Sequence, residues 1–137
     1  MDANACLALA LGCKVGRLAT TRPDGRADLV PVVVAFLGDA VVFAVDHKPK
    51  TTIRLQRLRN IDASPEVTLL FDHYDDDWTR LWWVRVRGRA RVLDSDDELT
   101  DMALDALQAA HPQYATARPA GPVVWIDTTE WTGWRAS

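Results

Sequence analysis

The sequence predicts a mainly β domain of the α+β class, a small antiparallel barrel of six strands with helices at its periphery. Short apolar runs with strand periodicity recur between turn signals, and two or three helical segments interrupt them. The clearest strand pattern is the alternation over residues 81–93. With 137 residues, 48% of them hydrophobic and 26% charged, the chain has the size and composition of one globular domain, covering 1–137.

Charge and cysteine content narrow the classes of function. The net charge of −3 predicts no general attraction to nucleic acid, so any anion site must be local. Cys6 and Cys13 match no CxxC or zinc spacing, and we expect two reduced core thiols in a cytoplasmic protein. No apolar run reaches the length of a membrane span, and the N-terminus lacks the pattern of a signal peptide.

The first three predicted strands are joined by tight turns and cover residues 15–21, 29–36 and 41–45. In the turn Arg22-Pro23-Asp24-Gly25, proline presets φ at the second position and glycine accepts a positive φ. Pro31 has no N–H donor, so we expect it at a sheet edge or a bulge. A helix over 3–13 precedes these strands. Three strands joined by hairpins predict an antiparallel meander.

The third strand leads into a basic turn and a helix. Apolar residues on both faces predict that this strand is buried on both sides. These are Val41, Phe43 and Val45 on one face and Val42 and Ala44 on the other. Asp46-His47-Lys48-Pro49 ends the strand, because proline cannot donate to a ladder. Thr51 or Thr52 can cap the helix that follows, which is expected to carry Arg54, Arg57 and Arg59 on its surface.

This turn has the features of an anion site. Free backbone N–H groups and the positive end of the helix dipole face the turn, and Lys48 and Lys50 add charge. A solvated basic loop is an equally plain interpretation of the same residues. The turn is not a P-loop, because the spacing GxxxxGK[ST] is absent.

The remaining predicted strands cover 66–72, 81–93 and 123–127, and a capping box at 95–98 begins a helix. Gly88 lies inside the long strand and is expected at a bulge or a close backbone approach. One face of that strand is apolar and includes Trp82, whereas the other carries Trp83 and four arginines, Arg85, Arg87, Arg89 and Arg91. A solvated face, paired across strands with Asp72 or Asp127, is the favoured interpretation of the arginines, and a groove for an acidic ligand tail is the alternative.

No catalytic side chain emerges from the sequence. The three serines have structural positions and no GxSxG motif occurs, so serine hydrolase chemistry is poorly supported. The acids around His73 are typical of a solvated turn rather than a metal site, since the EF-hand spacing is missing. An enzyme with this sequence would therefore depend on a cofactor for its reactivity.

Several blocks of sequence resemble a known family. They are Arg17 to Thr20, Pro23 to Arg26, Leu29 to Val32, Val45 to Lys50, His73 to Val86 and Trp131 to Trp134. Over residues 15–134 the chain resembles the split β-barrel proteins of the pyridoxamine-phosphate-oxidase-like superfamily, which includes FMN-binding split barrels. It is most similar to the actinobacterial branch of deazaflavin (coenzyme F420)-dependent oxidoreductases.

The resemblance implies a homodimer with two cofactor sites at the subunit interface. The cofactor phosphate would be held by Lys48 and Lys50 of the turn and by Thr51 and Arg54 at the helix start. Asp46 and His47 of the same turn would also belong to the cofactor site. Pro31, Val32 and Val33 would line the ring, and Trp82 and Trp83 would approach it, from the same or the other subunit.

The expected function is transfer of a hydride between reduced F420 and a small organic acceptor. FMN is the alternative cofactor in the same fold, and a non-catalytic flavin or F420 carrier is a rival of another class. A nucleic-acid binder built on Arg54, Arg57 and Arg59 is disfavoured by the acidic total charge and the lack of a recognisable binding motif.

Overall fold

The structure is a computed structural model that describes residues 1–45, 52–119 and 121–137, and of residues 52–55 it describes the backbone alone. Within these residues, seven strands form one antiparallel sheet in the order β2-β1-β5-β6-β7-β4-β3. The strands are β1 (Val15–Thr21), β2 (Ala27–Val33), β3 (Ala35–Leu37), β4 (Ala40–Ala44), β5 (Glu66–His73), β6 (Trp82–Leu93) and β7 (Val123–Arg135). The helices are α1 (Ala3–Ala10), α2 (Thr52–Ala63), α3 (Glu98–Ala110) and α4 (Gln113–Thr116), with a 3-10 turn η1 at Trp78–Arg80.

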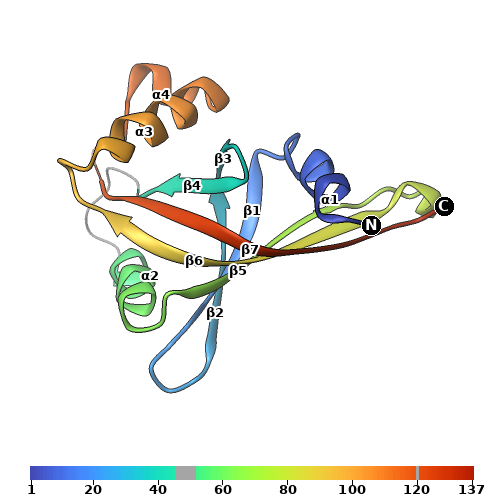
Figure 1. Cartoon of the computed structure of the whole chain (residues 1–137), viewed down its shortest axis with the longest axis horizontal. Coiled ribbons are helices and arrows are strands. Elements are labelled where there is room, and N and C mark those ends of the chain that lie inside the picture. The colour runs from blue at the N-terminus through green and yellow to red at the C-terminus, as the bar shows by residue number, and fades with distance from the viewer. Residues whose placement is uncertain (46–51, 120) are drawn as a thin grey trace.

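The strand predicted over 29–36 is two strands, so the predictions of six strands and of a meander are wrong. The ladder breaks at Val34, whose N–H donates to the Lys14 carbonyl at 3.1 Å. β2 pairs with β1, whereas β3 pairs with β4, and these two strands lie at opposite ends of the sheet order. Because β2 and β3 are joined by one residue, the sheet must curl until its two ends approach each other. The result is the half-barrel of Figure 1, with α2 on one side and α3 and α4 at one end.

The prediction for the strand that precedes the basic turn is confirmed. Every residue of β4 is buried. Val41 and Phe43 belong to the core inside the curled sheet, together with Leu18, Leu69, Phe71, Val84 and Val86. Val42 and Ala44 face a second core, formed with Leu93, Trp125 and the buried side of α3. This strand is therefore buried between two packed layers, which explains its apolar residues on both faces.

The C-terminal strand is longer than predicted. β7 continues to Arg135 and pairs with β6 along the whole length of that strand. β5, β6 and β7 together extend away from the barrel as a long arm that ends near the C-terminus (Figure 1). Gly88 lies at a register shift in the β6–β7 ladder, and a Cβ there would lie 2.6 Å from the Asp127 carbonyl oxygen. Both expectations for Gly88, a bulge and a close backbone approach, are confirmed.

The two outer helices differ from expectation in detail. α1 ends at Ala10, and Cys6 and Ala10 are its buried residues. The N-cap of α3 is Asp97, whose side chain accepts from the Leu99 N–H at 2.9 Å, so Ser95 does not cap this helix. On α3 the buried residues are Ala103, Leu104 and Leu107, whereas Met102 is 51% exposed although its helical spacing from Leu99 and Ala106 predicts the apolar face.

Both cysteines in the described residues are free thiols. Cys6 is buried, whereas Cys13 is half-buried beside the core. Burial raises the pKa of the Cys13 thiol, and the Asp72 carboxylate adds to the rise while Arg17 opposes it. Among the helices that the structure describes, none has the length and apolar character needed to span a membrane.

Candidate functional site

Much of the predicted anion turn lies outside the described residues. These residues are Asp46, His47, Lys48, Lys50 and Thr51. Arg54 belongs to α2, but its side chain is also outside the description. The anion site therefore stays a prediction. The structure describes only the elements that precede and follow this turn in the sequence, β4 and α2.

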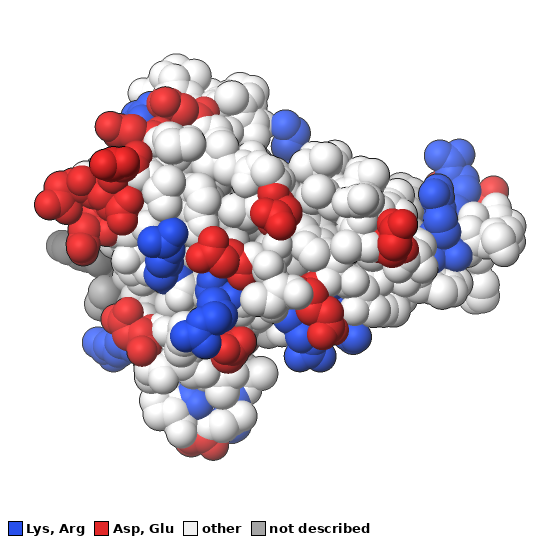
Figure 2. Space-filling model, in the orientation of Figure 1, with Lys and Arg blue, Asp and Glu red and all other residues white. Residues whose placement is uncertain are grey.

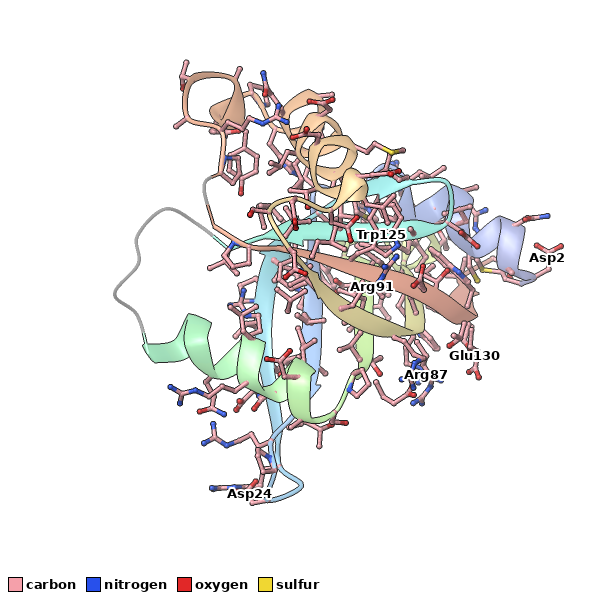
Figure 3. The ribbon with its side chains drawn as sticks, turned by 60° about the vertical axis from the view of Figure 1, so that its left-hand side comes forward. Asp2, Asp24, Arg87, Arg91, Trp125 and Glu130 are labelled. Atoms are coloured by element: carbon pink, nitrogen blue, oxygen red, sulfur yellow. The ribbon has the colours of Figure 1, made fainter. Side chains whose placement is uncertain are left out.

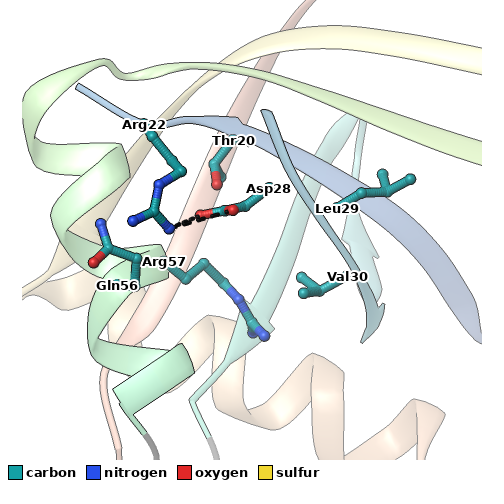
Figure 4. A pocket seen from close by; sticks show the side chains of 7 residues that line it. All are labelled: Thr20, Arg22, Asp28, Leu29, Val30, Gln56 and Arg57. Carbon is teal, nitrogen blue, oxygen red and sulfur yellow. Dashed lines mark hydrogen bonds and ion pairs between the residues drawn. The ribbon is translucent and has the colours of Figure 1, made fainter. Parts of the chain in front are cut away.

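A pocket of about 250 Å³ lies between α2 and the β1–β2 hairpin (Figure 4). Its lining residues are Thr20, Arg22, Asp28, Leu29, Val30, Gln56 and Arg57. Leu29 and Val30 are consecutive on β2 and point to opposite faces of the sheet, so a pocket that contacts both lies at the edge of the strand. In the described part of the chain β1 is the one strand that pairs with β2, so this edge offers backbone N–H and C=O groups to a ligand.

One wall of the pocket is a connected set of polar side chains. The Arg22 guanidinium donates to the Asp28 carboxylate, at 3.2 Å, and Asp28 also accepts from the Asn60 amide at 2.8 Å. Asn60 further donates to the Thr20 hydroxyl at 3.0 Å and accepts from Gln56 at 2.8 Å. Side chains held on several sides in this way have few alternative rotamers, so the wall is preorganised.

Arg57 lines this pocket rather than the outer surface of α2. Its guanidinium lies over the Phe43 ring, 5.8 Å from the ring centroid, and the side chain is half-buried. The prediction that Arg57 is a surface residue is therefore wrong, whereas Arg59 is exposed as expected. The helical spacing indicates that Arg57 faces inward, because Arg57 precedes the buried residues Asn60 and Ile61 by three and four positions and so shares their face of the helix.

The three residues predicted to line the cofactor ring alternate between two faces of β2. Val32 is buried in the barrel core, whereas Pro31 and Val33 are exposed on the outer face. Pro31 lies opposite Arg17, which lies opposite Leu70, which in turn lies opposite Arg85. Since residues paired across strands point to the same side, one outer face runs from β2 across β1 and β5 to β6. The expectation that Pro31 lies at a sheet edge is confirmed.

Trp82 and Trp83 lie on opposite faces of β6, as the alternation predicts. Trp82 packs against the barrel core and stacks with His73, with ring centroids 6.4 Å apart. Trp83 is on the outer face, where it lies opposite Trp134 of β7. Thus the structure brings Pro31, Val33 and Trp83 to one face of the sheet and leaves Val32 and Trp82 on the other.

A groove of about 470 Å³ crosses this outer face on the arm. Its lining residues include Leu70, Trp82, Trp83, Arg85 and Trp134, so both predicted tryptophans contact this groove although they belong to opposite faces of β6. The Arg85 guanidinium lies over the Trp83 indole at 5.5 Å, and its Nε is buried without a hydrogen-bond partner among the described residues. A buried donor of this kind is costly to leave unpaired, which sets Arg85 apart from the other arginines of this face.

Arg85, Arg87, Arg89 and Arg91 form the arginine stripe predicted on this face of β6, and the last three have acidic neighbours. The pairs are Arg87 with Glu130 at 3.8 Å, Arg89 with Glu66 at 2.6 Å and Arg91 with Asp127 at 3.8 Å. Figure 3 shows Arg87 beside Glu130 on this surface, and in Figure 2 the basic side chains on the visible face are interspersed with acidic ones. The predicted partner Asp127 is confirmed, whereas Asp72 pairs with Arg17 instead, at 3.6 Å. The stripe is largely a face of exposed cross-strand pairs.

The acidic loop at the end of the arm stabilises its own turns. Asp77 caps η1 by accepting from the Thr79 N–H and hydroxyl, and these hydrogen bonds lower the pKa of the Asp77 carboxyl. Asp75 accepts from the Asp77 N–H and lies 3.4 Å from the Arg80 guanidinium. In the residues that the structure describes, no group of three or more His, Cys, Asp or Glu could hold a metal ion.

The curled sheet, the edge-strand pocket beside α2 and the aromatic outer face define a small split barrel. Residues 3–135 match the family model of pyridoxamine 5'-phosphate oxidase, and the chain belongs to this family. A comparison with curated proteins finds no match.

Solved structures with the same fold include proteins of varied description. A FAD-binding protein from Mycobacterium smegmatis is 25% identical, with a TM-score of 0.69 over 99% of this chain and 97% of its own. A FAD-binding protein from Mesorhizobium loti is 20% identical, with a TM-score of 0.77 over 100% and 96% of the two chains. HutZ, a heme storage protein from Vibrio cholerae, is 11% identical, with a TM-score of 0.73 over 97% and 93%. The fold is therefore shared by flavin-binding and heme-binding proteins.

Proposed function

We propose that this protein is an oxidoreductase that binds a deazaflavin or flavin cofactor in the pocket beside α2 and transfers a hydride to or from a small organic molecule. The observation that carries the proposal is the pocket at the free edge of β2, with Arg22 and Arg57 among its lining residues. Membership of the pyridoxamine 5'-phosphate oxidase family supports a flavin-type ligand.

The residues around the pocket fit such a cofactor by their chemistry. A flavin or deazaflavin combines a planar ring that has hydrogen-bonding edges with a phosphate-bearing tail. Leu29, Val30 and the exposed backbone edge of β2 suit the ring. Lys48, Lys50, Thr51 and Arg54 at the start of α2 suit the phosphate, because a helix N-terminus and cations both favour an anion. When bound, the reduced cofactor supplies the hydride. The protein binds and orients the cofactor and excludes water from the site.

We assign F420 as the cofactor, with FMN as the alternative. The basis is the long sequence blocks at 45–50 and 73–86, which resemble F420-dependent oxidoreductases. F420 carries a lactyl-oligoglutamate tail that needs more cations than FMN does. The arginines Arg87, Arg89 and Arg91 are engaged in ion pairs, so a tail site on them would require those pairs to open.

We further propose that the working unit is a homodimer that pairs through the outer face of β2, β1, β5, β6 and β7. Five large apolar residues on this face are exposed by about a third to two thirds: Val15 36%, Leu29 67%, Val33 37%, Leu70 37% and Trp134 47%. Several exposed large apolar side chains on one face of a sheet, with charged residues between them, are typical of an interface. Leu29 belongs to both this face and the cofactor pocket, so a second copy would lie next to the pocket.

The proposal is tested by titrating purified protein with F420 and with FMN while the visible spectrum and fluorescence are recorded. Saturable binding of F420 that is tighter than that of FMN is expected, and tighter FMN binding would reverse the choice of cofactor. Bound reduced cofactor is then exposed to a panel of organic acceptors. Oxidation by an acceptor supports an enzyme, whereas binding without any oxidation supports the non-catalytic carrier. Failure to bind either cofactor would overturn the proposal.

A further inference from the structure

We propose that Asn60 is a positioning residue that holds the polar wall of the cofactor pocket in its binding arrangement. The inference rests on the proposed function of that pocket. Asn60 itself does not line the pocket, yet it contacts three of the seven residues that do.

Asn60 is fully buried, with 0% of its surface exposed. Its amide nitrogen donates to Thr20 at 3.0 Å and to Asp28 at 2.8 Å, and its amide oxygen accepts from Gln56 at 2.8 Å. Both donor hydrogens and one acceptor lone pair are thus used, which leaves little rotational freedom. A buried amide costs free energy unless it is satisfied in this way, so a leucine would be the ordinary residue at a position with a purely packing role.

The three contacts join three separate elements. Thr20 lies on β1, Asp28 on β2 and Gln56 one turn earlier on α2. A fourth of the five polar lining residues, Arg22, is held indirectly, because it donates to Asp28 at 3.2 Å (Figure 4). Asn60 is therefore the one described residue that hydrogen-bonds to side chains from all three elements of the wall, and it sets both the side-chain geometry and the seating of α2 against the β1–β2 hairpin.

Charge explains why this residue is an amide. Asn60 and Arg22 both donate to the Oδ2 atom of Asp28, at 2.8 and 3.2 Å, and Asn60 does so without adding a charge to a buried position. Replacing Asn60 by Asp would set two carboxylates 2.8 Å apart and break this contact by repulsion. Exchanging the two side chains, as Asn60→Asp with Asp28→Asn, restores one amide and one carboxylate at the same place, with the hydrogen bond reversed in direction.

The experiment compares F420 and FMN titrations and thermal melts for the unmodified protein, Asn60→Asp, the exchanged double variant and Ile61→Val. Ile61 is the control for stability, because it is 2% exposed on the same helix but packs in the core and does not line the pocket. We expect Asn60→Asp to weaken cofactor binding at least about tenfold, as for loss of a hydrogen bond to a charged group. The double variant should recover part of this loss, because the hydrogen bond between positions 60 and 28 is remade while the ion pair of Arg22 with Asp28 is not.

Binding is measured well below the lowest melting temperature, so that every variant is folded. Ile61→Val should lower the melting temperature by a few degrees and leave binding unchanged. Unchanged binding by Asn60→Asp, an equal loss in Ile61→Val, or no recovery in the double variant would each overturn the positioning role. If the unmodified protein binds neither cofactor, the proposed function fails first and this inference falls with it.

Discussion

Arg85 lies over the indole of Trp83, 5.5 Å from the ring centroid, with its Nε buried and without a hydrogen-bond partner among the described residues. The neighbouring arginines of the same strand face contact acids across the sheet, so Arg85 differs from them in its surroundings. A partner that covers the groove would bury the exposed apolar residues beside it, Leu70 and Trp134 among them. The outer face therefore exposes apolar side chains of the kind that a subunit interface buries.

The first prediction concerns this face. Leu70→Lys places a charge between Arg17 and Arg85 at the centre of the proposed interface, so the dimer should dissociate to monomers at micromolar concentration. Met102→Lys is the matched control, because Met102 is 51% exposed on α3, away from the face, and the variant should stay dimeric. Light scattering coupled to gel filtration gives the mass. A monomeric unmodified protein would contradict the proposed dimer directly.

The second prediction concerns the basic turn before α2. A hydrogen bond to a charged group is worth about 1.5–3 kcal/mol, so Lys50→Ala should weaken F420 or FMN binding roughly ten- to a hundredfold. Arg59→Ala is the control, because Arg59 is exposed on the same helix and should leave binding nearly unchanged. Both variants should melt close to the unmodified protein. Equal affinity of Lys50→Ala and the unmodified protein would mean that the phosphate binds elsewhere.

The third prediction separates the two interpretations of the arginine stripe. Arg89 and Glu66 pair at 2.6 Å with side chains that are 59% and 67% exposed. An exposed pair contributes about 0.2–1 kcal/mol, so Arg89→Gln should lower the free energy of unfolding by no more than this. F420 binding and its salt dependence should not change. A clear loss of F420 affinity, without loss of FMN affinity, would instead assign the stripe to the glutamate tail.

The fourth prediction concerns the bulge in β6. A Cβ at Gly88 would lie 2.6 Å from the Asp127 carbonyl oxygen and 2.7 Å from the Ile126 side chain. Gly88→Ala must push the β6 and β7 strands apart, which should cost about 1–3 kcal/mol of stability. Gly12→Ala is the control, since a Cβ there meets no atom within 4 Å. Urea denaturation measures the stability of each variant. A Gly88→Ala variant as stable as the unmodified protein would contradict the bulge geometry.

Local patterns determined much of the fold. Alternation located β1 and most of β6, and the doubly apolar run at 41–45 correctly indicated a strand buried on both sides. The missing N–H of proline predicted a sheet edge at Pro31, and the glycine inside a strand pattern predicted the bulge at Gly88. These features depend on the backbone preferences of single residues or on a period of two, which a sequence displays directly.

The tertiary structure alone decided which strands are neighbours and which side chains meet. No local pattern distinguishes a meander from a sheet in which β2 and β3 lie at opposite ends, because the pairing of each strand depends on segments distant in the sequence. The pocket wall likewise joins residues 20, 22, 28, 56 and 60, whose contacts exist only after α2 packs against the β1–β2 hairpin. The sequence by itself determined most of the strands, both buried faces of β4 and a basic turn suited to an anion. Packing between distant segments decided that Arg57 faces inward and that Asn60 lies at the centre of the wall, because burial depends on all neighbours and not on the residue alone.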